Sequence, residues 1–373
     1  MKTIYNCHCH LFTDKNLPNN YLGFGLVKMV RNKSVAKSAQ FLLRNLNPLS
    51  GYDVGNRFDA FLKAVYRESQ EENLKALIGY YPEGTKFIVL PMDMAYMQRK
   101  SLPFTKPKKG KIEEDIDEQH NKLAVLAKSY PNTVIPFAHI DPRREDSLER
   151  LSSLVEKSGF KGVKIYPPLG YSPTHPRLLE EIYPYMQKKN IPLIAHCSPG
   201  SVYTQETDKK SAHQYAHPNN YIEVMDKFPK LRICLAHFGG IGEWKRFFSE
   251  SRDSRNPAWV KVIIDLMRAN EYPNLYADIS YTIFDQQENV PLLKVLLQDE
   301  KIRDKVLFGS DFYMVENHKY SERRLSIDLR SELGEKLFWQ IANANPKAFL
   351  NIDTLDIKTL LNKNANVVFE YEK

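Results

Sequence analysis

Two histidines near the start of the chain, His8 and His10, have a spacing that can hold a metal ion. They lie in a run of β-prone residues, and in a strand residues i and i+2 point to the same face. The two imidazoles would then stand side by side, with Cys7 and Cys9 on the other face. Such a pair is also common among ordinary surface or core histidines, so its meaning depends on the rest of the chain.

Further groups with metal-binding or acid–base chemistry follow later apolar runs. They are Lys164, His196, His237 and Asp311. Together with the first pair they offer four imidazoles and a carboxylate, an ample donor set for divalent zinc, iron, manganese or cobalt. Taken singly, each also fits a hydrogen-bonded polar residue at a strand end. The set predicts a metal centre only if the fold brings its members together.

Eight short apolar runs separated by helical patterns must position these groups. The runs cover residues 3–12, 86–93, 133–141, 160–166, 191–197, 231–237, 274–280 and 305–311. Helical spacing appears over residues 34–46, 56–80, 116–130, 147–157, 177–189, 220–228, 257–270, 290–298 and 333–350. Alternation of buried strands and helices is typical of α/β proteins with a parallel sheet. Eight units favour a closed (β/α)8 TIM barrel, and no G-x-G-x-x-G turn supports a dinucleotide-binding sheet.

In such a barrel, side chains at the carboxyl ends of the strands converge on the axis. The six groups above lie at or near these ends, which favours one shared centre. Tyr166, on the same strand face as Lys164, either lines the pocket or packs in the core. The pairs His139 with Asp141, and Asp278 with Ser280, end the third and seventh strands, where they either hydrogen-bond to the site or pair structurally.

The predicted barrel occupies residues 1–350, with a helical cap inserted over residues 13–85 and a C-terminal extension over residues 351–373. Specificity in barrels resides in the loops after the strands, here the cap and a polar loop over residues 198–219. Arg57 in the cap, and His175, His213 and His217 in loops, are weaker candidates for substrate contact.

Composition limits the class of protein. Four cysteines in 373 residues make no disulfide framework, which favours a reducing, cytoplasmic setting. No run reaches the ~18 apolar residues that a membrane span needs. The net charge of +8 comes from scattered residues and one cluster around residues 106–111 that reads as a solvated loop, so we expect no nucleic acid partner. A positive field favours a small anionic substrate. A homodimer is the commonest assembly for such an enzyme.

Five short phrases of the chain resemble the amidohydrolase superfamily. They are the His-x-His of His8 and His10, Gly-Val-Lys164, Ile-Ala-His196, Leu-Ala-His237-Phe-Gly-Gly and Gly-Ser-Asp311. The resemblance covers residues 3 to about 350. It is more specific to the amidohydrolase-2 branch, which includes aminocarboxymuconate-semialdehyde decarboxylase.

The resemblance implies one metal ion, most simply Zn²⁺, held by four ligands. These are His8, His10, His196 and Asp311. It assigns His237 to activation of a metal-bound water or polarisation of the substrate. Chemistry agrees, because a cation among neutral imidazoles lowers the pKa of water toward ~7. Asp311 can accept the proton of that water, and His237 can orient it.

The resemblance allows two roles for Lys164. In binuclear relatives the lysine of the fourth strand becomes a carbamate between two metals, and His196 and His237 then hold the second ion. In mononuclear relatives the lysine meets an anionic substrate group or a neighbouring acid. The phrase around Lys164 is closer to the mononuclear branch, so one metal is expected.

The first functional prediction is hydrolysis of an amide, lactone or related C–N or C–O bond. The alternative is a non-oxidative decarboxylase or hydratase that uses the same metal as a Lewis acid on a small carboxylic acid. A TatD-like nuclease is disfavoured because Lys164 replaces an acid and no aromatic and basic stripe follows a phosphate backbone. A binding barrel without catalysis would be expected to lose a ligand, and none is missing.

Overall fold

The computed structural model describes residues 2–16, 67–98, 112, 114–199, 209–251, 254–312 and 321–352. Eight parallel strands pair in sequence order: β1 (Tyr5–Cys9), β2 (Lys86–Val89), β3 (Val134–His139), β4 (Gly162–Ile165), β5 (Leu193–His196), β6 (Ile233–Ala236), β7 (Leu275–Asp278) and β8 (Val306–Leu307). The Cys7 N–H donates to the Phe308 carbonyl at 2.8 Å, and Cys9 bridges to Phe312, so the last strand returns to the first. The predicted (β/α)8 TIM barrel is confirmed.

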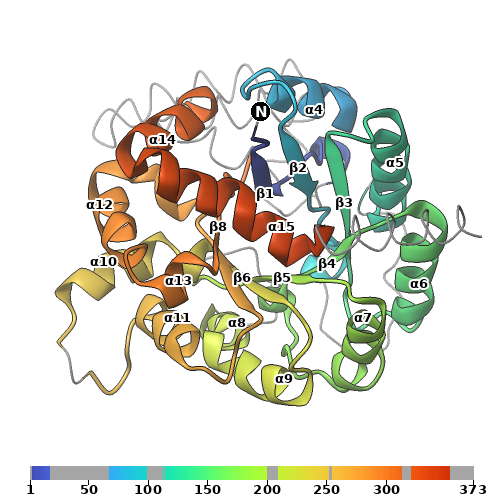
Figure 1. Ribbon diagram of the computed structural model, residues 1–373. Coiled ribbons are helices and arrows are strands. Elements are labelled where there is room, and N and C mark those ends of the chain that lie inside the picture. The colour runs from blue at the N-terminus through green and yellow to red at the C-terminus, as the bar shows by residue number, and fades with distance from the viewer. Residues whose placement is uncertain are drawn as a thin grey trace, which may run out of the picture.

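Helices surround the strands, as Figure 1 shows. They are α4 (Gln70–Ile78), α5 (Ile116–Ser129), α6 (Ser147–Ser158), α7 (Tyr183–Lys189), α8 (Lys209–Ala216), α9 (Ile222–Lys227), α10 (Ile241–Ser249), α11 (Trp259–Arg268), α12 (Gln286–Leu296), α13 (Glu300–Arg303), α14 (Glu322–Trp339) and α15 (Asn345–Leu350). A π-helical turn, Leu178–Ile182, precedes α7, and another, Gln340–Ala344, joins α14 to α15. None of the helices in these described ranges combines the length and hydropathy of a membrane-crossing segment.

Several predicted boundaries were wrong. The polar loop expected over residues 198–219 contains α8, and α10 and α13 were not predicted at all. The helix expected over 56–80 begins, within the described residues, only at Gln70, because the Ser69 side chain caps it by accepting the Glu72 N–H. The strand expected over 305–311 ends at Leu307, because the Phe308 N–H then donates to the Ile341 carbonyl and the Ser310 N–H to the Asn6 side chain. The predicted helix 34–46 and Arg57 lie outside the described residues, as do most of the cap and of the C-terminal extension.

The barrel interior is packed with apolar side chains and closed at its amino-terminal end. One buried cluster joins inward-facing residues of β1, β2, β3, β5, β6, β7 and β8 to Phe349 of α15. The Phe349 ring lies 5.2 Å from that of Tyr276, and Figure 1 shows α15 crossing over the strands. Gly162 is required on β4, because a Cβ there would lie 2.2 Å from the Phe137 ring. With this end filled, the carboxyl ends of the strands remain for chemistry.

Candidate metal centre

Three of the predicted ligands converge at the carboxyl end of the barrel. Nε2 of His10 lies 3.2 Å from Oδ1 of Asp311, and Nε2 of His8 lies 3.6 Å from the same oxygen. All three residues are buried, and one ligand atom from each lies within 4.8 Å of the others. This His-His-Asp group is able to hold a divalent metal ion.

The hydrogen bonds made by the Nδ1 atoms of His8 and His10 determine the protonation of the Nε2 atoms, which face Asp311. Nδ1 of His10 lies 2.7 Å from the Leu90 carbonyl, and Nδ1 of His8 lies 3.0 Å from Oδ2 of Asp278. Both partners can only accept, so each Nδ1 carries the proton and each Nε2 presents a lone pair. Two lone pairs and a carboxylate oxygen then face one another. That arrangement fits a bound cation and is unfavourable without one.

The carboxylate of Asp278 fixes the ring of His8. Its Oδ1 accepts the backbone N–H groups of His237 (3.1 Å) and Ser280 (3.0 Å), and the Ser280 hydroxyl bonds to the same oxygen. Its Oδ2 bonds to His8 and to the thiol of Cys234 at 3.7 Å. Burial alone would favour the neutral acid, but the His8 and Ser280 hydrogen bonds hold the pKa of Asp278 well below its usual range. Burial and the nearby Lys164 lower the pKa of His8 to about 3, so this imidazole is neutral.

Asp311 is held against β1 through its backbone. Its N–H donates to the His8 carbonyl at 2.8 Å, and its φ of 67° turns the carboxylate toward His8 and His10. Burial opposes ionisation of this acid, but its contact with His10 and the nearby His8 and His237 imidazoles keep its pKa below the usual value. Asp311 is therefore a carboxylate, the form that binds a metal or accepts a proton.

His237 begins four consecutive residues with positive φ: His237, Phe238, Gly239 and Gly240. Non-glycine residues adopt this conformation only when surrounding contacts hold it. Here the His237 N–H donates to Asp278, the Thr282 hydroxyl donates to the His237 carbonyl at 2.7 Å, and the Trp244 indole donates to the Phe238 carbonyl at 2.9 Å. The turn places the His237 ring 4.8 Å, centroid to centroid, from both His8 and His196.

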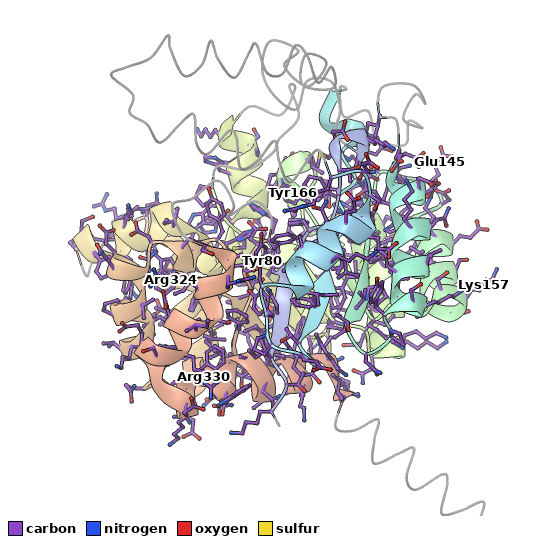
Figure 2. The ribbon with its side chains drawn as sticks, turned by 90° about the horizontal axis from the view of Figure 1, so that it is seen from above. Tyr80, Glu145, Lys157, Tyr166, Arg324 and Arg330 are labelled. Atoms are coloured by element: carbon purple, nitrogen blue, oxygen red, sulfur yellow. The ribbon has the colours of Figure 1, made fainter. Side chains whose placement is uncertain are left out.

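His196 contacts His237 and does not belong to the converging His8, His10 and Asp311 group. Its Nδ1 lies 3.2 Å from Nε2 of His237, and its Nε2 lies 3.1 Å from the Ser198 hydroxyl. Tyr166 stacks on the His196 ring with centroids 4.2 Å apart. Figure 2 shows Tyr166 toward the opposite end of the molecule from Arg330 of α14. A role for His196 as fourth ligand stays a prediction, and Tyr166 both packs and borders the site.

Lys164 is fully buried on β4 with Nζ 3.4 Å from Nε2 of His8. Burial lowers the pKa of this lysine to about 8, against the opposing effects of Asp278, Asp311 and Cys234. The ammonium form therefore prevails at neutral pH, and it brings positive charge to the group of ligands.

A second possible group, His8, His237 and Asp278, overlaps the first. Its members already satisfy one another, because Asp278 bonds directly to His8 and to the His237 N–H. Nδ1 of His237 also lies 3.2 Å from the Ser280 carbonyl and 2.9 Å from the Ser280 hydroxyl. These bonds need no cation, so this group orients the rings of the first one.

Some of the weaker candidates reach the site and others do not. Asp278 and Ser280 reach the site, whereas Asp141 forms a buried ion pair with Arg143 at 2.6 Å. His217 packs its ring 5.0 Å from that of Trp259, and His175 lies half-buried in a turn before α7. Ser198 and the Leu90 carbonyl were missed. Ser198 follows His196 by two residues, but nothing in the sequence shows that the backbone of Leu90 lies under His10.

Comparison with known proteins gives a family match over nearly the whole chain. Residues 5–352 match a family model described as amidohydrolase. Among solved structures, 2,6-dihydroxybenzoate decarboxylase from Rhizobium is 15% identical, with a TM-score of 0.54 over 95% of this chain and 100% of that one. Dihydroxybenzoic acid decarboxylase from Polaromonas sp., solved with manganese and 2-nitroresorcinol, is 15% identical, with a TM-score of 0.56 over 95% and 98%. A manganese-bound 5-carboxyvanillate decarboxylase from Novosphingobium aromaticivorans is 12% identical, with a TM-score of 0.56 over 94% and 97%. These likenesses agree with the barrel.

Proposed function

Because this chain belongs to the amidohydrolase family, we propose that it is a metal-dependent, non-oxidative decarboxylase of a small carboxylic acid. Decarboxylation, the alternative in the sequence analysis, thereby becomes the main proposal, and hydrolysis becomes the second candidate. The three solved structures described above span 94–95% of this chain and carry the names of decarboxylases, and two of the three are described with manganese. The names support a lyase over a hydrolase.

The observation that carries the proposal is one converging ligand group beside a buried ammonium. His8, His10 and Asp311 would hold the ion, with His196 as the predicted fourth ligand, and Mn²⁺ or Zn²⁺ suits these donors. Once bound, the ion supplies Lewis-acid chemistry, which polarises a substrate oxygen. The phrase around Lys164, which is closer to the mononuclear branch, favours one metal over the two of a carbamate-bridged hydrolase.

Lys164 is placed to attract the substrate. Its ammonium lies 3.4 Å from His8 in a buried site, and none of the described carboxylates forms an ion pair with it. A substrate carboxylate is a favourable partner for such a buried cation. Charge-assisted hydrogen bonds of this kind are about twice as strong as neutral ones. The lysine therefore selects an anionic substrate and holds its carboxylate.

Decarboxylation breaks the bond between the substrate carbon and its carboxylate, releases CO₂, and leaves an electron pair on carbon that takes up one proton. His237 is the proposed donor of that proton. Its Nδ1 faces the Ser280 carbonyl, so the proton to be transferred is one carried on Nε2, the atom that contacts Nδ1 of His196 at 3.2 Å. Burial lowers the pKa of His237, and its protonated form is therefore a strong acid that gives the proton up readily.

Hydrolysis remains the second candidate because Asp311 is held as a carboxylate beside two ligands. A carboxylate in this position is suited to accept the proton of an attacking water.

Product analysis separates the two functions. The purified chain is loaded with Mn²⁺ and incubated with 2,6-dihydroxybenzoate, 5-carboxyvanillate and a panel of amides and lactones. Release of CO₂, with one deuterium from D₂O on the product carbon, supports decarboxylation. Both signals should fall at least about 100-fold in His237→Asn, as for loss of a general acid. Cleavage of an amide or lactone with no CO₂ from any acid would replace the proposal with the hydrolase.

A further inference from the structure

His139, the last residue of β3, has a buried nitrogen that the described protein leaves unsatisfied. Its side chain is 2% exposed, and no described residue hydrogen-bonds to its Nε2. Its Nδ1 lies 3.2 Å from the Pro91 carbonyl, which can only accept, so Nδ1 carries the proton and Nε2 presents a lone pair. Buried acceptors of this kind are rare in native proteins and call for an explanation.

The strand register places this ring inside the barrel. His139 pairs directly with Lys164 on β4, and paired residues of neighbouring parallel strands point to the same face. Lys164 points inward, since it contacts His8. Phe137, two residues before His139, belongs to the inner apolar cluster. The imidazole therefore projects inward at the level of Lys164.

His139 and the metal-facing His10 bond to two consecutive carbonyls of the segment that follows β2. Nδ1 of His10 lies 2.7 Å from the carbonyl of Leu90, and Nδ1 of His139 lies 3.2 Å from the carbonyl of Pro91, the next residue. The backbone N–H of His139 is itself bound, since it donates to Nε2 of His120 at 3.0 Å. A residue that is held at both its backbone and its Nδ1 keeps its Nε2 in one fixed direction.

The site thus offers a donor and an acceptor next to each other. Lys164 presents an ammonium, and His139 presents a lone pair on a ring whose pKa burial lowers to about 4, so that it stays neutral at neutral pH. The two groups suit a molecule that carries a carboxylate and, at another position, a hydrogen-bond donor.

We propose that Nε2 of His139 accepts a hydrogen bond from a hydroxyl or N–H group of the substrate and so selects acids that carry such a donor. The carboxylate in this substrate class rests on the proposed function, whereas the acceptor role of His139 rests on the geometry alone. His139 acts in binding and specificity, not in the proton transfer.

The test compares matched ligands that differ only in the donor. Isothermal titration of the full, Mn²⁺-loaded chain is carried out with 2-, 3- and 4-hydroxybenzoate and with the corresponding methoxybenzoates. At least one hydroxy acid should bind about five- to tenfold more tightly than its methoxy counterpart, the gain of one buried hydrogen bond. In His139→Leu this ratio should fall to about one. In His139→Gln, whose amide oxygen reaches the position of Nε2, much of the ratio should return.

His217→Gln is the matched control, because it removes an imidazole that packs on Trp259 outside the site and should leave the ratio unchanged. Equal ratios in wild type and His139→Leu would overturn the proposal, as would a wild type that prefers no hydroxy acid or binds none. A wild-type preference for a hydroxy acid that is lost in His139→Leu, without release of CO₂ from any acid, would reject the decarboxylase and leave the role of His139 standing. Release of CO₂ without a hydroxyl preference would reject only the role of His139.

Discussion

Nζ of Lys164 lies 3.4 Å from Nε2 of His8, and both side chains are fully buried. A cation thus stands next to the nitrogen that faces Asp311, inside a site that is buried from solvent. The distance links recognition of an anion to the ligand group, because a carboxylate drawn to Lys164 arrives within reach of His8 and Asp311.

Replacing Lys164 by methionine should weaken anion binding and spare metal binding. A hydrogen bond to a charged group contributes about 1.5–3 kcal/mol, so the affinity for benzoate should fall by about 10- to 100-fold. Titration calorimetry measures the affinity, and plasma mass spectrometry measures the metal per chain. Lys161→Met removes an exposed lysine from the residue just before β4 and should change neither. Loss of metal from Lys164→Met would instead point to a lysine that bridges two ions.

Metal binding should stabilise the fold through His8 and His10. A ligand present at 100 times its dissociation constant raises the free energy of unfolding by about 2.7 kcal/mol, so adding Mn²⁺ after chelation should raise the melting temperature by several degrees. The His8→Ala, His10→Ala double variant should show no such rise. The His175→Ala, His217→Ala double variant removes two histidines outside the site and should behave as wild type. Equal shifts in both double variants would place the metal elsewhere.

Asp278→Asn should lower metal affinity without removing a ligand. The asparagine keeps the size of the side chain, but its amide has only one oxygen. It therefore cannot accept both from His8 and from the backbone N–H groups of His237 and Ser280. Loss of such an orienting carboxylate costs about 10- to 100-fold in metal affinity. Competition with a fluorescent chelator measures this change. Asp265→Asn, which removes an exposed carboxylate paired with Lys261 on α11, should have no effect.

The buried His120 should make the protein sensitive to mild acid. Burial lowers its pKa to about 3 from a usual value of 6.5. Between these values the unfolded chain binds a proton that the folded chain does not. Stability from this group is therefore complete above pH 6.5 and falls as pH drops toward 3, by up to about 1.4 kcal/mol per pH unit.

Urea unfolding of wild type and His120→Gln at pH 7.5, 6.0 and 5.0 checks this prediction. The variant should lose stability with a shallower slope. Some acid sensitivity should remain, because burial lowers the pKa of His139 to about 4 and this acts in the same direction. Parallel curves for the two proteins would show that His120 does not titrate on unfolding.

The order of the strands and the positions of His8, His10 and Asp311 at strand ends were readable from the sequence. Burial and backbone period are local properties, so eight apolar runs separated by helical spacing predict eight parallel units and identify the residues at their carboxyl ends. The phrases around these residues also sufficed for the family, which the match over residues 5–352 confirms.

The partners of these residues were decided by the closed barrel alone. The bond between His8 and Asp278 joins residues 270 positions apart, and the lone pair of His139 follows from the carbonyl of Pro91, which lies just after β2. Whether His196 turned toward the ligands or toward His237 was equally unreadable. Such contacts depend on strand register and on the direction of single carbonyls, which no local pattern encodes. The sequence by itself determined which groups reach the end of the barrel, and the tertiary structure decided which atoms face one another there.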